Sequence, residues 1–564
     1  MAHPFDEAVD AVRLGITSAP GLLHVGTIEA HGARWPGFDS APADLPALFE
    51  ACCALYADRE CLVDGADRLT FAQAHVLARR MAAGLTLTHG VKAGDHVGLA
   101  ARNGAGWVVA YMGIVMAGGV ATLVNSFWTG QEMAQAISDV DCALVLADRF
   151  RHDALRTHSD MQARLVLLDL DLPIDACLAP LLGDPDALPL VSPGPDAPAT
   201  LLFTSGSTGQ SKGALSDHRA KVQAALHFAS AASAVSALAQ RQGAPEPPPP
   251  ATLLNLPLFH VTGEVVVMLQ SFVIGRKMVV MRRWDALDAL RLIEQERITY
   301  VTGVPLMGME LATHPQRGEF DLSSLSDLAA GGAPRPAEQV ERLRAGLPGT
   351  WQSFGFGLTE TNAVGTGIMR DAVYAYPGSP GRPTPPLVEL AIIDEDGVPL
   401  EAGQEGEIGV RSISNISGYW NRPADNETLF SPAGHVLTGD IGFLDEDGYL
   451  TIVGRKKDII IRGGENVASP EVEAALYAIP QVIECAVFGV PDVRFGEVPI
   501  AVIRADADSG LDEARIGEAL AGRLASYKRP SQILFQSTPL PRLGSEKIDK
   551  RAIRDAYLAV DATV

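Results

Sequence analysis

The chain has 564 residues, of which 47% are hydrophobic and 20% are charged. Its 45 basic residues against 68 acidic ones give a net charge of −23, which argues against general nucleic-acid binding. This balance is typical of a soluble globular protein with more than one domain. The six cysteines lack paired spacing, so we predict neither a zinc site nor disulfides and expect a reducing, cytoplasmic location.

The N-terminus, Met-Ala-His-Pro-Phe-Asp, lacks the basic and then apolar order of a signal peptide, and residues 1–45 hold no clear motif. The uncharged stretch Gly104–Val124 is long enough to suggest a membrane span. However, Gly118 and Gly119 interrupt it. We therefore predict a buried helix over Trp107–Ala117, a strand over Val120–Val124 and no membrane span.

From about residue 45 onwards, helix-like and strand-like segments alternate along the chain. Helical patterns cover Ala72–Leu87 and His218–Ala231, and the proline-rich residues 242–250 predict an exposed connection. The strand-like runs are His96–Ala101, Cys142–Ala147, Ala163–Leu168, Ala199–Phe203, Ala251–Leu256, Met278–Met281 and Ile298–Thr302. This alternation predicts an α/β fold with doubly wound sheets and helices on both faces.

Two further regions follow this α/β part. From Val388 onwards, apolar runs are separated by turns that end at Asp396-Gly397 and Asp447-Gly448, which predicts a small antiparallel β subdomain. The basic run Gly454–Asp458 marks a boundary, and a compact α+β pattern follows it. We predict a large domain over residues 1–454 and a small domain over residues 455–564. The predicted elements of the small domain are a helix from about Pro470, strands at Ala486–Val490 and Ile500–Ile503, and a helix at Ile516–Leu524.

A glycine- and serine-rich loop follows the strand-like run that ends at Phe203. Its sequence is Thr204-Ser-Gly-Ser-Thr-Gly-Gln-Ser-Lys-Gly213. Glycines let backbone N–H groups approach a ligand closely, while the hydroxyls and Lys212 add donors and a positive charge. Such a loop suits a polyphosphate, although a plain surface loop would have the same composition. It is not a Walker A loop, because Ser211 precedes the lysine and Gly213 follows it.

A series of short motifs lies downstream of this loop, and each is ambiguous alone. Their purely structural interpretations are a buried histidine, plain turns, a helix cap and solvated charged loops. The motifs are Pro257-Leu-Phe-His260, Gly331-Gly-Ala-Pro334, Phe354-Gly-Phe-Gly-Leu-Thr-Glu-Thr361, Thr438-Gly-Asp440, Arg455-Lys-Lys-Asp458, Arg462-Gly-Gly-Glu-Asn466 and Pro541-Arg-Leu-Gly-Ser-Glu-Lys547-Ile-Asp-Lys550-Arg551.

Taken together and in this order, the loop and the motifs resemble the adenylate-forming superfamily of acyl-CoA synthetases, amino-acid adenylation domains and luciferases. The resemblance covers about residues 45–551. It departs at two positions, because the family usually has Pro where Ser211 stands and Gly where Glu546 stands. Amino-acid-activating members carry an Asp that holds the substrate amine, and none occurs between Asn255 and Trp284. The resemblance therefore points to the acyl-CoA synthetase branch.

The resemblance implies binding sites for ATP and Mg²⁺. The implied phosphate contacts are Thr204, Ser205, Gly206, Ser207, Thr208, Gly209, Lys212 and Thr359. The implied adenine contacts are Gly332, Ala333, Pro334, Phe356 and Gly357. Asp440 and Arg455 are expected to hold the ribose, and Glu360 with Thr208 is expected to hold Mg²⁺, a cation that prefers oxygen ligands.

The resemblance also implies sites for a carboxylic acid and for CoA. His260, Val261 and Gly331 are expected to border the acyl pocket, and Gly463 with Gly464 is expected to line the CoA tunnel. Gly263, Gly303 and Val304 are further candidates for the acyl pocket. The small domain is expected to rotate about a hinge at Lys457. Lys547 is the implied catalytic lysine, which reaches the carboxylate and the α-phosphate.

The implied reaction joins a carboxylate to ATP, giving an acyl-adenylate and pyrophosphate, after which the CoA thiol displaces AMP. The small or apolar pocket candidates favour a medium- or long-chain fatty acid, with an aryl acid as the second hypothesis. Three competing hypotheses concern the reaction itself: a non-catalytic homologue, a kinase-like phosphotransferase and a luciferase-like oxygenase. The expected partners are small molecules only, while peripheral membrane association and a homodimer are left open.

Overall fold

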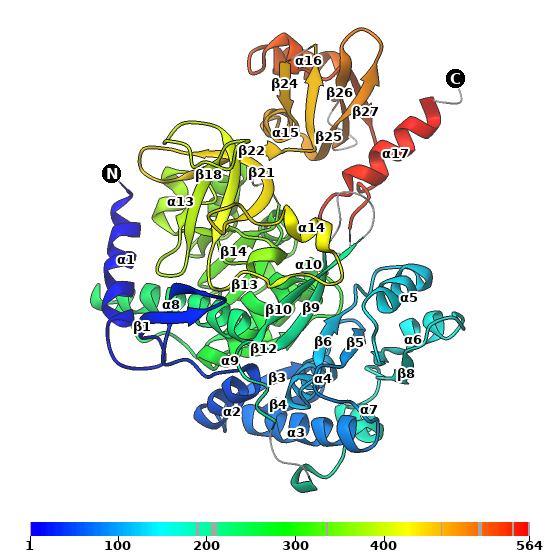
Figure 1. Cartoon of the computed structure of the whole chain (residues 1–564). Coiled ribbons are helices and arrows are strands. Elements are labelled where there is room, and N and C mark those ends of the chain that lie inside the picture. The colour runs from blue at the N-terminus through cyan, green and yellow to red at the C-terminus, as the bar shows by residue number, and fades with distance from the viewer. Residues whose placement is uncertain are drawn as a thin grey trace.

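The computed structural model of this chain describes residues 2–187, 191–204, 211–333, 335, 337–463, 465–505, 510–543 and 546–561. Figure 1 shows a large body that runs from the blue N-terminus through the green and yellow segments. A smaller orange domain lies above it, and the chain ends in the red helix α17 (Lys550–Asp561).

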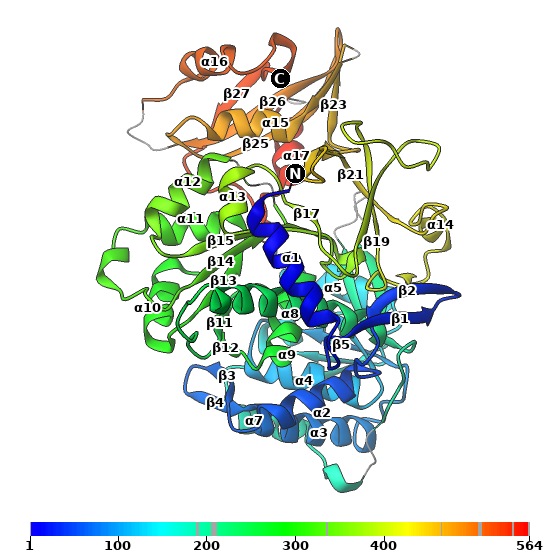
Figure 2. The same cartoon turned by 90° about the vertical axis from the view of Figure 1, so that its left-hand side faces the viewer.

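The first 45 residues, for which the sequence predicted no motif, form a helix and a hairpin. Helix α1 (Pro4–Thr17) lies along α8 (His218–Arg241), as Figure 2 shows. The buried Arg13 donates hydrogen bonds of 2.9 Å to the Ser230 hydroxyl and to the His227 carbonyl, which fastens the two helices. Strands β1 (Val25–Ala30) and β2 (Ala33–Phe38) pair antiparallel.

The first large sheet has seven strands in the order β20-β10-β9-β6-β5-β7-β8. The strands from β9 to β8 pair in parallel, and β10 and β20 add an antiparallel edge. Its strands are β5 (His96–Ala100), β6 (Val120–Leu123), β7 (Leu144–Ala147), β8 (Arg164–Leu167), β9 (Pro198–Thr204), β10 (Lys212–Asp217) and β20 (Gly418–Tyr419). The helices among these strands are α3 (Phe71–Leu87), α4 (Ala105–Met116), α5 (Gly130–Asp139), α6 (Arg149–Leu155) and α7 (Ile174–Leu178).

The second large sheet has nine strands in the order β17-β16-β15-β14-β13-β11-β12-β3-β4, with parallel pairing from β15 to β3. Its strands are β3 (Glu60–Asp64), β4 (Asp67–Thr70), β11 (Ala251–Leu254), β12 (Lys277–Val280), β13 (Tyr300–Gly303), β14 (Asp327–Gly331), β15 (Trp351–Phe356), β16 (Thr366–Met369) and β17 (Arg382–Pro383). Its helices are α2 (Leu45–Leu55), α9 (Gln270–Ile274), α10 (Ala286–Glu296), α11 (Pro305–Thr313), α12 (Ala337–Gly346) and α13 (Asp371–Ala375), with a π-helix at Thr262–Leu269. The prediction of an α/β fold with doubly wound sheets is confirmed.

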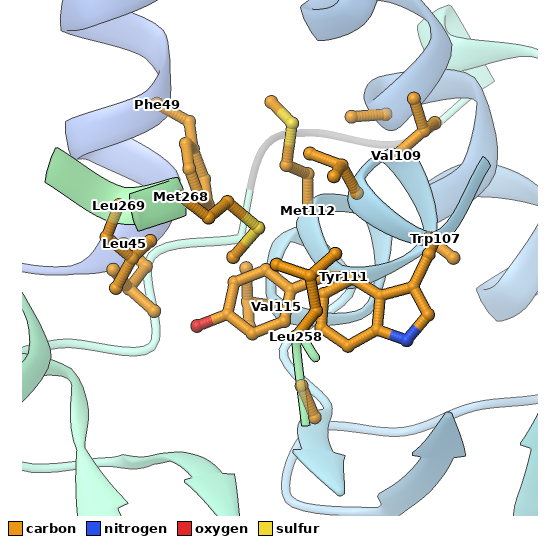
Figure 3. Packing of buried hydrophobic residues seen from close by; sticks show 14 of the residues in the cluster. Leu45, Phe49, Trp107, Val109, Tyr111, Met112, Val115, Leu258, Met268 and Leu269 are labelled. Carbon is orange, nitrogen blue, oxygen red and sulfur yellow. The ribbon is translucent and has the colours of Figure 1, made fainter. Parts of the chain in front are cut away.

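The core between the two sheets is built around α4, every residue of which is buried. A helix that is apolar on all sides is stable only when neighbours surround it. Its Trp107 and Tyr111 rings stack with centroids 5.7 Å apart, and Tyr111 meets Phe49 of α2 edge-on (Figure 3). The same hydrophobic cluster includes Leu99 of β5 and Met278 of β12, so it joins both sheets. The prediction of a buried helix here is confirmed.

Helix α8 is ten residues longer than the sequence predicted, since it ends at Arg241 rather than at Ala231. Its extension is rich in alanine, the best helix former, and buries Ala234, Val235 and Leu238 against α1. Among the described residues, α8 is also the helix long and apolar enough to cross a membrane, and 56% of that apolar window is buried inside the fold.

A four-stranded antiparallel sheet follows the two large sheets, as predicted. It has the order β18-β19-β21-β22, with strands β18 (Glu389–Ile393), β19 (Gly406–Arg411), β21 (Val436–Leu444) and β22 (Leu450–Arg455). The Asp445–Gly448 turn joins β21 directly to β22. The Asp394–Gly397 turn instead closes on a short bridge between Ile393 and Pro399, and the long partner strand begins only at Gly406.

The small domain has its own sheet and its own hydrophobic core. Its strands are β23 (Ile459–Arg462), β24 (Glu465–Ala468), β25 (Val482–Asp492), β26 (Gly496–Ala505) and β27 (Gln532–Phe535). Its helices are α15 (Ser469–Tyr477), α16 (Glu513–Ala521) and α17. A large domain of sheets followed by a smaller α+β domain therefore matches the predicted architecture.

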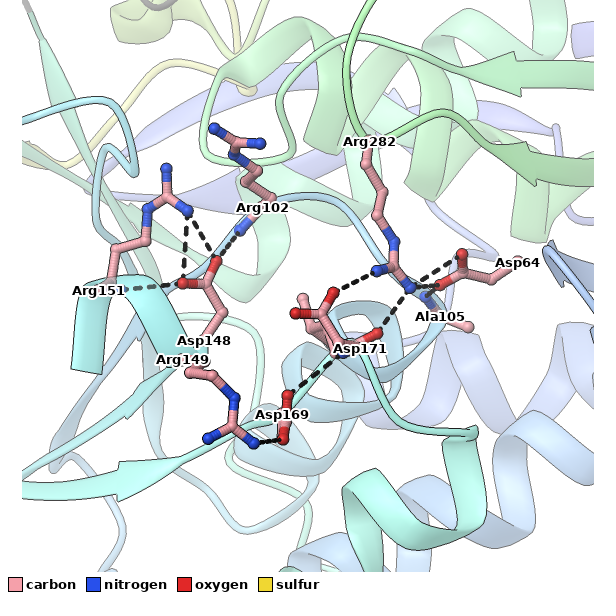
Figure 4. A network of polar contacts seen from close by, with 10 residues as sticks. Asp64, Arg102, Ala105, Asp148, Arg149, Arg151, Asp169, Asp171 and Arg282 are labelled. Carbon is pink, nitrogen blue, oxygen red and sulfur yellow. Dashed lines mark hydrogen bonds and ion pairs between the residues drawn. The ribbon is translucent and has the colours of Figure 1, made fainter. Parts of the chain in front are cut away.

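Ion pairs connect the ends of strands from the two large sheets (Figure 4). Arg282, which follows β12, lies 3.3 Å from a carboxylate oxygen of Asp64 at the end of β3 and 3.0 Å from one of Asp171. At the end of β7, Asp148 accepts from Arg151 of α6 at 3.1 Å. Of these contacts, the Arg282–Asp171 pair joins the two sheets, since Asp171 follows β8.

Candidate active site

The predicted phosphate loop connects β9 to the antiparallel strand β10. Thr204 ends β9 directly opposite Lys212, the first residue of β10. The ammonium of Lys212 forms an ion pair with Asp425 of the short helix α14 (Pro423–Glu427) and lies 5.0 Å from the centroid of the Tyr419 ring. The other predicted loop contacts, Ser205, Gly206, Ser207, Thr208 and Gly209, lie outside the described residues.

Glu360, the predicted metal ligand, contacts the same tyrosine as Lys212. It belongs with Thr359 to a 3-10 turn, Thr359–Thr361, that follows β15. The Tyr419 hydroxyl donates a hydrogen bond of 2.5 Å to Glu360, and burial together with this carboxylate raises the pKa of the phenol. Carboxylate oxygens are ligands that a hard divalent cation prefers, so the Glu360 side chain fits the predicted role of a Mg²⁺ ligand.

The predicted adenine wall lies where β14 and β15 end side by side. Gly331 pairs with Gly355, and the following Gly332 has φ +73°, which favours glycine. A methyl group on Gly357 would lie 2.2 Å from the Ala363 carbonyl oxygen, so only glycine fits there. Phe356 packs against the small antiparallel sheet. Ala333 follows in the same turn, and Pro334 lies outside the described residues.

The predicted ribose contacts face each other across β21 and β22. The Arg455 Nε donates to Asp440 at 3.2 Å, and the two residues are direct partners in the strand register. Burial raises the pKa of the Asp440 carboxyl, and the charges of Arg455 and Lys547 oppose that shift. This geometry leaves a buried carboxylate beside two cations, which is suited to accepting hydrogen bonds from a diol.

Lys547 reaches this group of residues from the small domain. A methyl group placed on Gly332 would lie 3.1 Å from Lys547 Cε and 3.3 Å from its Nζ. Burial and the charge of Arg455 lower the pKa of Lys547 to about 8, against the opposing effect of Asp440. Burial and the charge of Lys547 lower the pKa of His260 to about 3. The structure therefore brings the predicted catalytic lysine to the predicted adenine, ribose and acyl residues.

Among the predicted acyl-pocket residues, His260 has a buried Nε2 with no hydrogen-bond partner in the described part of the chain. Val304 is buried with Leu256 and Met307 in one apolar cluster. Val261 is buried as well. Two glycines allow close packing here, since a methyl group would lie 2.3 Å from the Pro257 carbonyl at Gly263 and 2.6 Å from the Met307 sulfur at Gly303.

The predicted CoA-tunnel residue Gly463 is not brought to Lys547. It lies exposed in the turn between β23 and β24, with φ +61°, and its N–H donates to the Phe495 carbonyl at 2.7 Å. Gly464 lies outside the described residues. The predicted hinge residue, Lys457, lies in the turn between β22 of the antiparallel sheet and β23 of the small domain.

Sequence reasoning did not find Tyr419 and Asp425, which contact Glu360 and Lys212. Tyr419 belongs to the two-residue strand β20, which pairs with β10 at Ala214. So short a strand leaves no periodic pattern, and no motif marks either residue. Only the arrangement of strands shows that they belong to the site.

Comparison with known proteins identifies the family of this chain. The family model of AMP-binding enzymes matches residues 49–420, and that of the AMP-binding enzyme C-terminal domain matches residues 471–547. The chain therefore belongs to the family of adenylate-forming, AMP-binding enzymes.

Its similar relatives are acyl- and aryl-CoA ligases. A long-chain fatty acid–CoA ligase of Mycobacterium tuberculosis is 32% identical over 87% of this chain and 94% of its own length. A feruloyl-CoA synthase of an Amycolatopsis species is 33% identical over 87% of this chain and 95% of its own length. The crystal structure of ATP-bound MatB from Rhodopseudomonas palustris superposes with a TM-score of 0.78 and 28% identity, covering 91% of this chain and 99% of that one.

Proposed function

We propose that this chain is an AMP-forming carboxylic acid–CoA ligase that acts on medium- or long-chain fatty acids. The observation that carries the proposal is the position of Lys547, next to Gly332 and to the Asp440–Arg455 pair. A lysine from a separate domain, held among nucleotide-binding candidates with its charge poorly compensated, is suited to meeting an anion. The family membership of the chain and the CoA ligases among its relatives support the same reaction.

The first half-reaction would use the large domain to hold ATP. Lys212 and the loop after Thr204 would contact the phosphates, Asp440 and Arg455 would hold the ribose, and Phe356 would flank the adenine. Lys547 would stabilise the negative charge that develops as a carboxylate oxygen bonds to the α-phosphorus and the bond to pyrophosphate breaks. Magnesium bound at Glu360, with Thr208 as a further ligand, would neutralise phosphate charge.

The second half-reaction would need a different arrangement of the small domain. Lys547 now occupies the site, and Gly463 lies away from it. Rotation about Lys457 would withdraw Lys547 and bring Gly463 and Gly464 in, so that a CoA thiol reaches the acyl carbonyl and AMP leaves. One pocket would then serve two reactions in turn, as in other enzymes gated by domain movement.

The fatty-acid assignment is supported by the apolar character of the predicted acyl-pocket residues, since Val304 is buried with Leu256 and Met307, and Val261 is buried as well. An aryl acid is the second candidate, because ferulate-activating and fatty-acid-activating relatives are almost equally similar to this chain. Similarity to these relatives therefore does not identify the substrate, and an experiment has to identify it.

The test is a panel of fatty and aryl acids assayed for CoA-dependent release of AMP. We expect AMP and pyrophosphate with a subset of fatty acids. Release of ADP would instead indicate a phosphotransferase, and light emission or oxygen uptake would indicate a luciferase-like reaction. The complete absence of carboxylate-dependent ATP–pyrophosphate exchange across the panel would refute the ligase proposal in favour of a non-catalytic homologue.

A further inference from the structure

A completely buried ion pair joins helix α8 to the π-helix Thr262–Leu269. The Lys221 Nζ lies 2.6 Å from one carboxylate oxygen of Glu264, and both side chains are 0% exposed. The other carboxylate oxygen accepts a hydrogen bond of 2.8 Å from the Tyr111 hydroxyl of α4. Each oxygen of Glu264 is therefore held by a different helix, and this fixes the direction of the side chain.

Stability alone does not account for three polar groups at this place. Tyr111 belongs to the apolar core cluster of Figure 3, which also contains Met268 and Leu269 of the π-helix. Burial lowers the pKa of the Lys221 ammonium, while the charge of Glu264 opposes that shift. Taking two charges out of water costs so much free energy that apolar residues of similar size are often equally stable or more stable. The pair therefore has to bring a benefit other than stability.

Glu264 is also directly connected to the predicted acyl pocket. Its backbone N–H donates to the His260 carbonyl at 2.9 Å, so the two residues are one helical turn apart. Between them lies Gly263, where a methyl group would lie 2.3 Å from the Pro257 carbonyl oxygen. Because this turn is so closely packed, a shift of Glu264 is passed on to His260 and Val261.

The helix that carries Glu264 has an uncommon backbone. The N–H of Gln270, which follows Leu269, donates to the Val265 carbonyl five residues earlier, whereas an α-helix uses the carbonyl four residues earlier. Helices of this kind are rare and occur frequently at functional sites. Because a π-helical turn holds more residues than an α-helical turn, relaxation to an α-helix would rotate His260 relative to α9. The contacts of Glu264 with α8 and α4 oppose that rotation.

We propose that Glu264 is a positioning residue that determines the chain-length specificity of the acyl pocket. Lys221 and Tyr111 hold its carboxylate, and its backbone holds residues 260–263, which are expected to border the acyl chain. The pocket then adapts little to acids of other lengths. Glu264 touches no reacting atom and acts only through this turn. The identity of the ligand rests on the proposed ligase function, whereas the fixed turn exists without any substrate.

The test replaces the three polar groups together with apolar residues of similar size. One triple variant combines Tyr111→Phe, Lys221→Met and Glu264→Leu. It leaves no member of the buried pair without its partner, so its melting temperature should equal or exceed that of the wild type. Amide hydrogen exchange of the full-length protein is then followed by mass spectrometry without substrates. We expect exchange in residues 257–269 to become about tenfold faster, because local opening needs less free energy, and peptides of the small domain to stay unchanged.

The activity readout is the preference for chain length, measured with the acids that the wild type activates. The ratio of kcat/KM between the preferred acid and one that is two methylenes longer should fall by about three- to tenfold in the triple variant, since a well-defined apolar pocket discriminates strongly between chain lengths. The value of kcat/KM for ATP should stay unchanged, because the turn is not expected to contact the nucleotide.

Two further variants sharpen the result. Tyr111→Phe alone keeps the ion pair and should give a smaller increase of exchange in residues 257–269. The control is Arg13→Met, which removes another buried cation that contacts α8, at Ser230 and His227. It should change neither the exchange of residues 257–269 nor the chain-length preference.

Three results would overturn the proposal. The first is unchanged exchange of residues 257–269 in the triple variant. The second is faster exchange with an unchanged chain-length preference. The third is a triple variant that does not fold or melts well below the wild type, because the polar groups would then serve stability. If the wild type activates no acid, the ligase assignment fails, and the exchange rates alone decide whether Glu264 positions residues 260–263.

Discussion

Two lysines are assigned to phosphate chemistry here, and their surroundings differ in kind. Lys212 belongs to a strand of the large domain, and its charge is balanced by Asp425. Lys547 belongs to a turn of the small domain, where burial and the charge of Arg455 lower its pKa to about 8 against the opposing charge of Asp440. Because Asp425 already balances its charge, Lys212 is suited to a fixed position in the large domain. A lysine whose charge is poorly balanced depends on an incoming anion, and this suits a group that enters and leaves the site.

The largest effect should come from removing the lysine of the small domain. Lys547→Ala should lower ATP–pyrophosphate exchange by about 10²- to 10³-fold, because a positioned charge contributes most in the transition state. Thioester formation from a supplied acyl-adenylate should stay close to the wild-type rate. The measurement follows the two half-reactions separately, with Lys528→Ala as a control on a half-buried lysine of the same domain that pairs with Glu471. Equal damage to both half-reactions would contradict the assigned role.

Removal of Lys212, the lysine of the large domain, should have a smaller effect than removal of Lys547. Lys212→Ala should lower kcat/KM for ATP by about 10- to 100-fold, the usual value of a charge-assisted hydrogen bond. The thioester half-reaction, which involves no ATP, should be spared. Steady-state kinetics with ATP as the varied substrate tests this, and the exposed Lys92→Ala serves as the control. A change in kcat for thioester formation would show that Lys212 supports the fold rather than the phosphates.

The two lysines should also differ in their pH dependence. Lys547 is charged below its pKa of about 8 and loses its proton above it, so kcat/KM for ATP should fall by about tenfold per pH unit at higher pH. Lys547→Arg should remove this alkaline limb, because a guanidinium stays charged throughout the range. A pH–rate profile of both proteins provides the measurement. An unchanged limb in the arginine variant would assign the titration to another group.

The smallest effect should come from removing the charge of Asp425, the ion-pair partner of Lys212. Asp425→Asn removes the charge that competes with ATP for the ammonium, so KM for ATP should fall by about two- to fivefold, as expected for a partly exposed ion pair. Measuring the reaction rate while ATP is varied at constant ionic strength is sufficient to detect the change in KM. A rise in KM would mean that Asp425 positions Lys212 for ATP instead of competing for it.

Local patterns predicted most elements of this fold. The apolar run at Val120–Val124 became β6, and the helical pattern at Ala72–Leu87 became α3, because periodicity reports which faces are buried. The end of α8 was missed, since its alanine-rich extension is stabilised by packing on α1, a contact that no local pattern contains. The helix and hairpin of the first 38 residues were missed because they carry no motif.

For the candidate site as well, some features could be predicted from the sequence and others could not. The resemblance to the adenylate-forming family was sufficient to select Glu360, Asp440, Arg455 and Lys547 as candidates, because each of its motifs is contiguous in the chain. The tertiary structure alone decided that Lys547 lies beside Gly332 and that Tyr419 bridges Glu360 and Lys212. It also decided that the backbone of Glu546 adopts a left-handed conformation. The physical reason is that these relations join segments far apart in the sequence, and only sheet order and domain docking determine such distances.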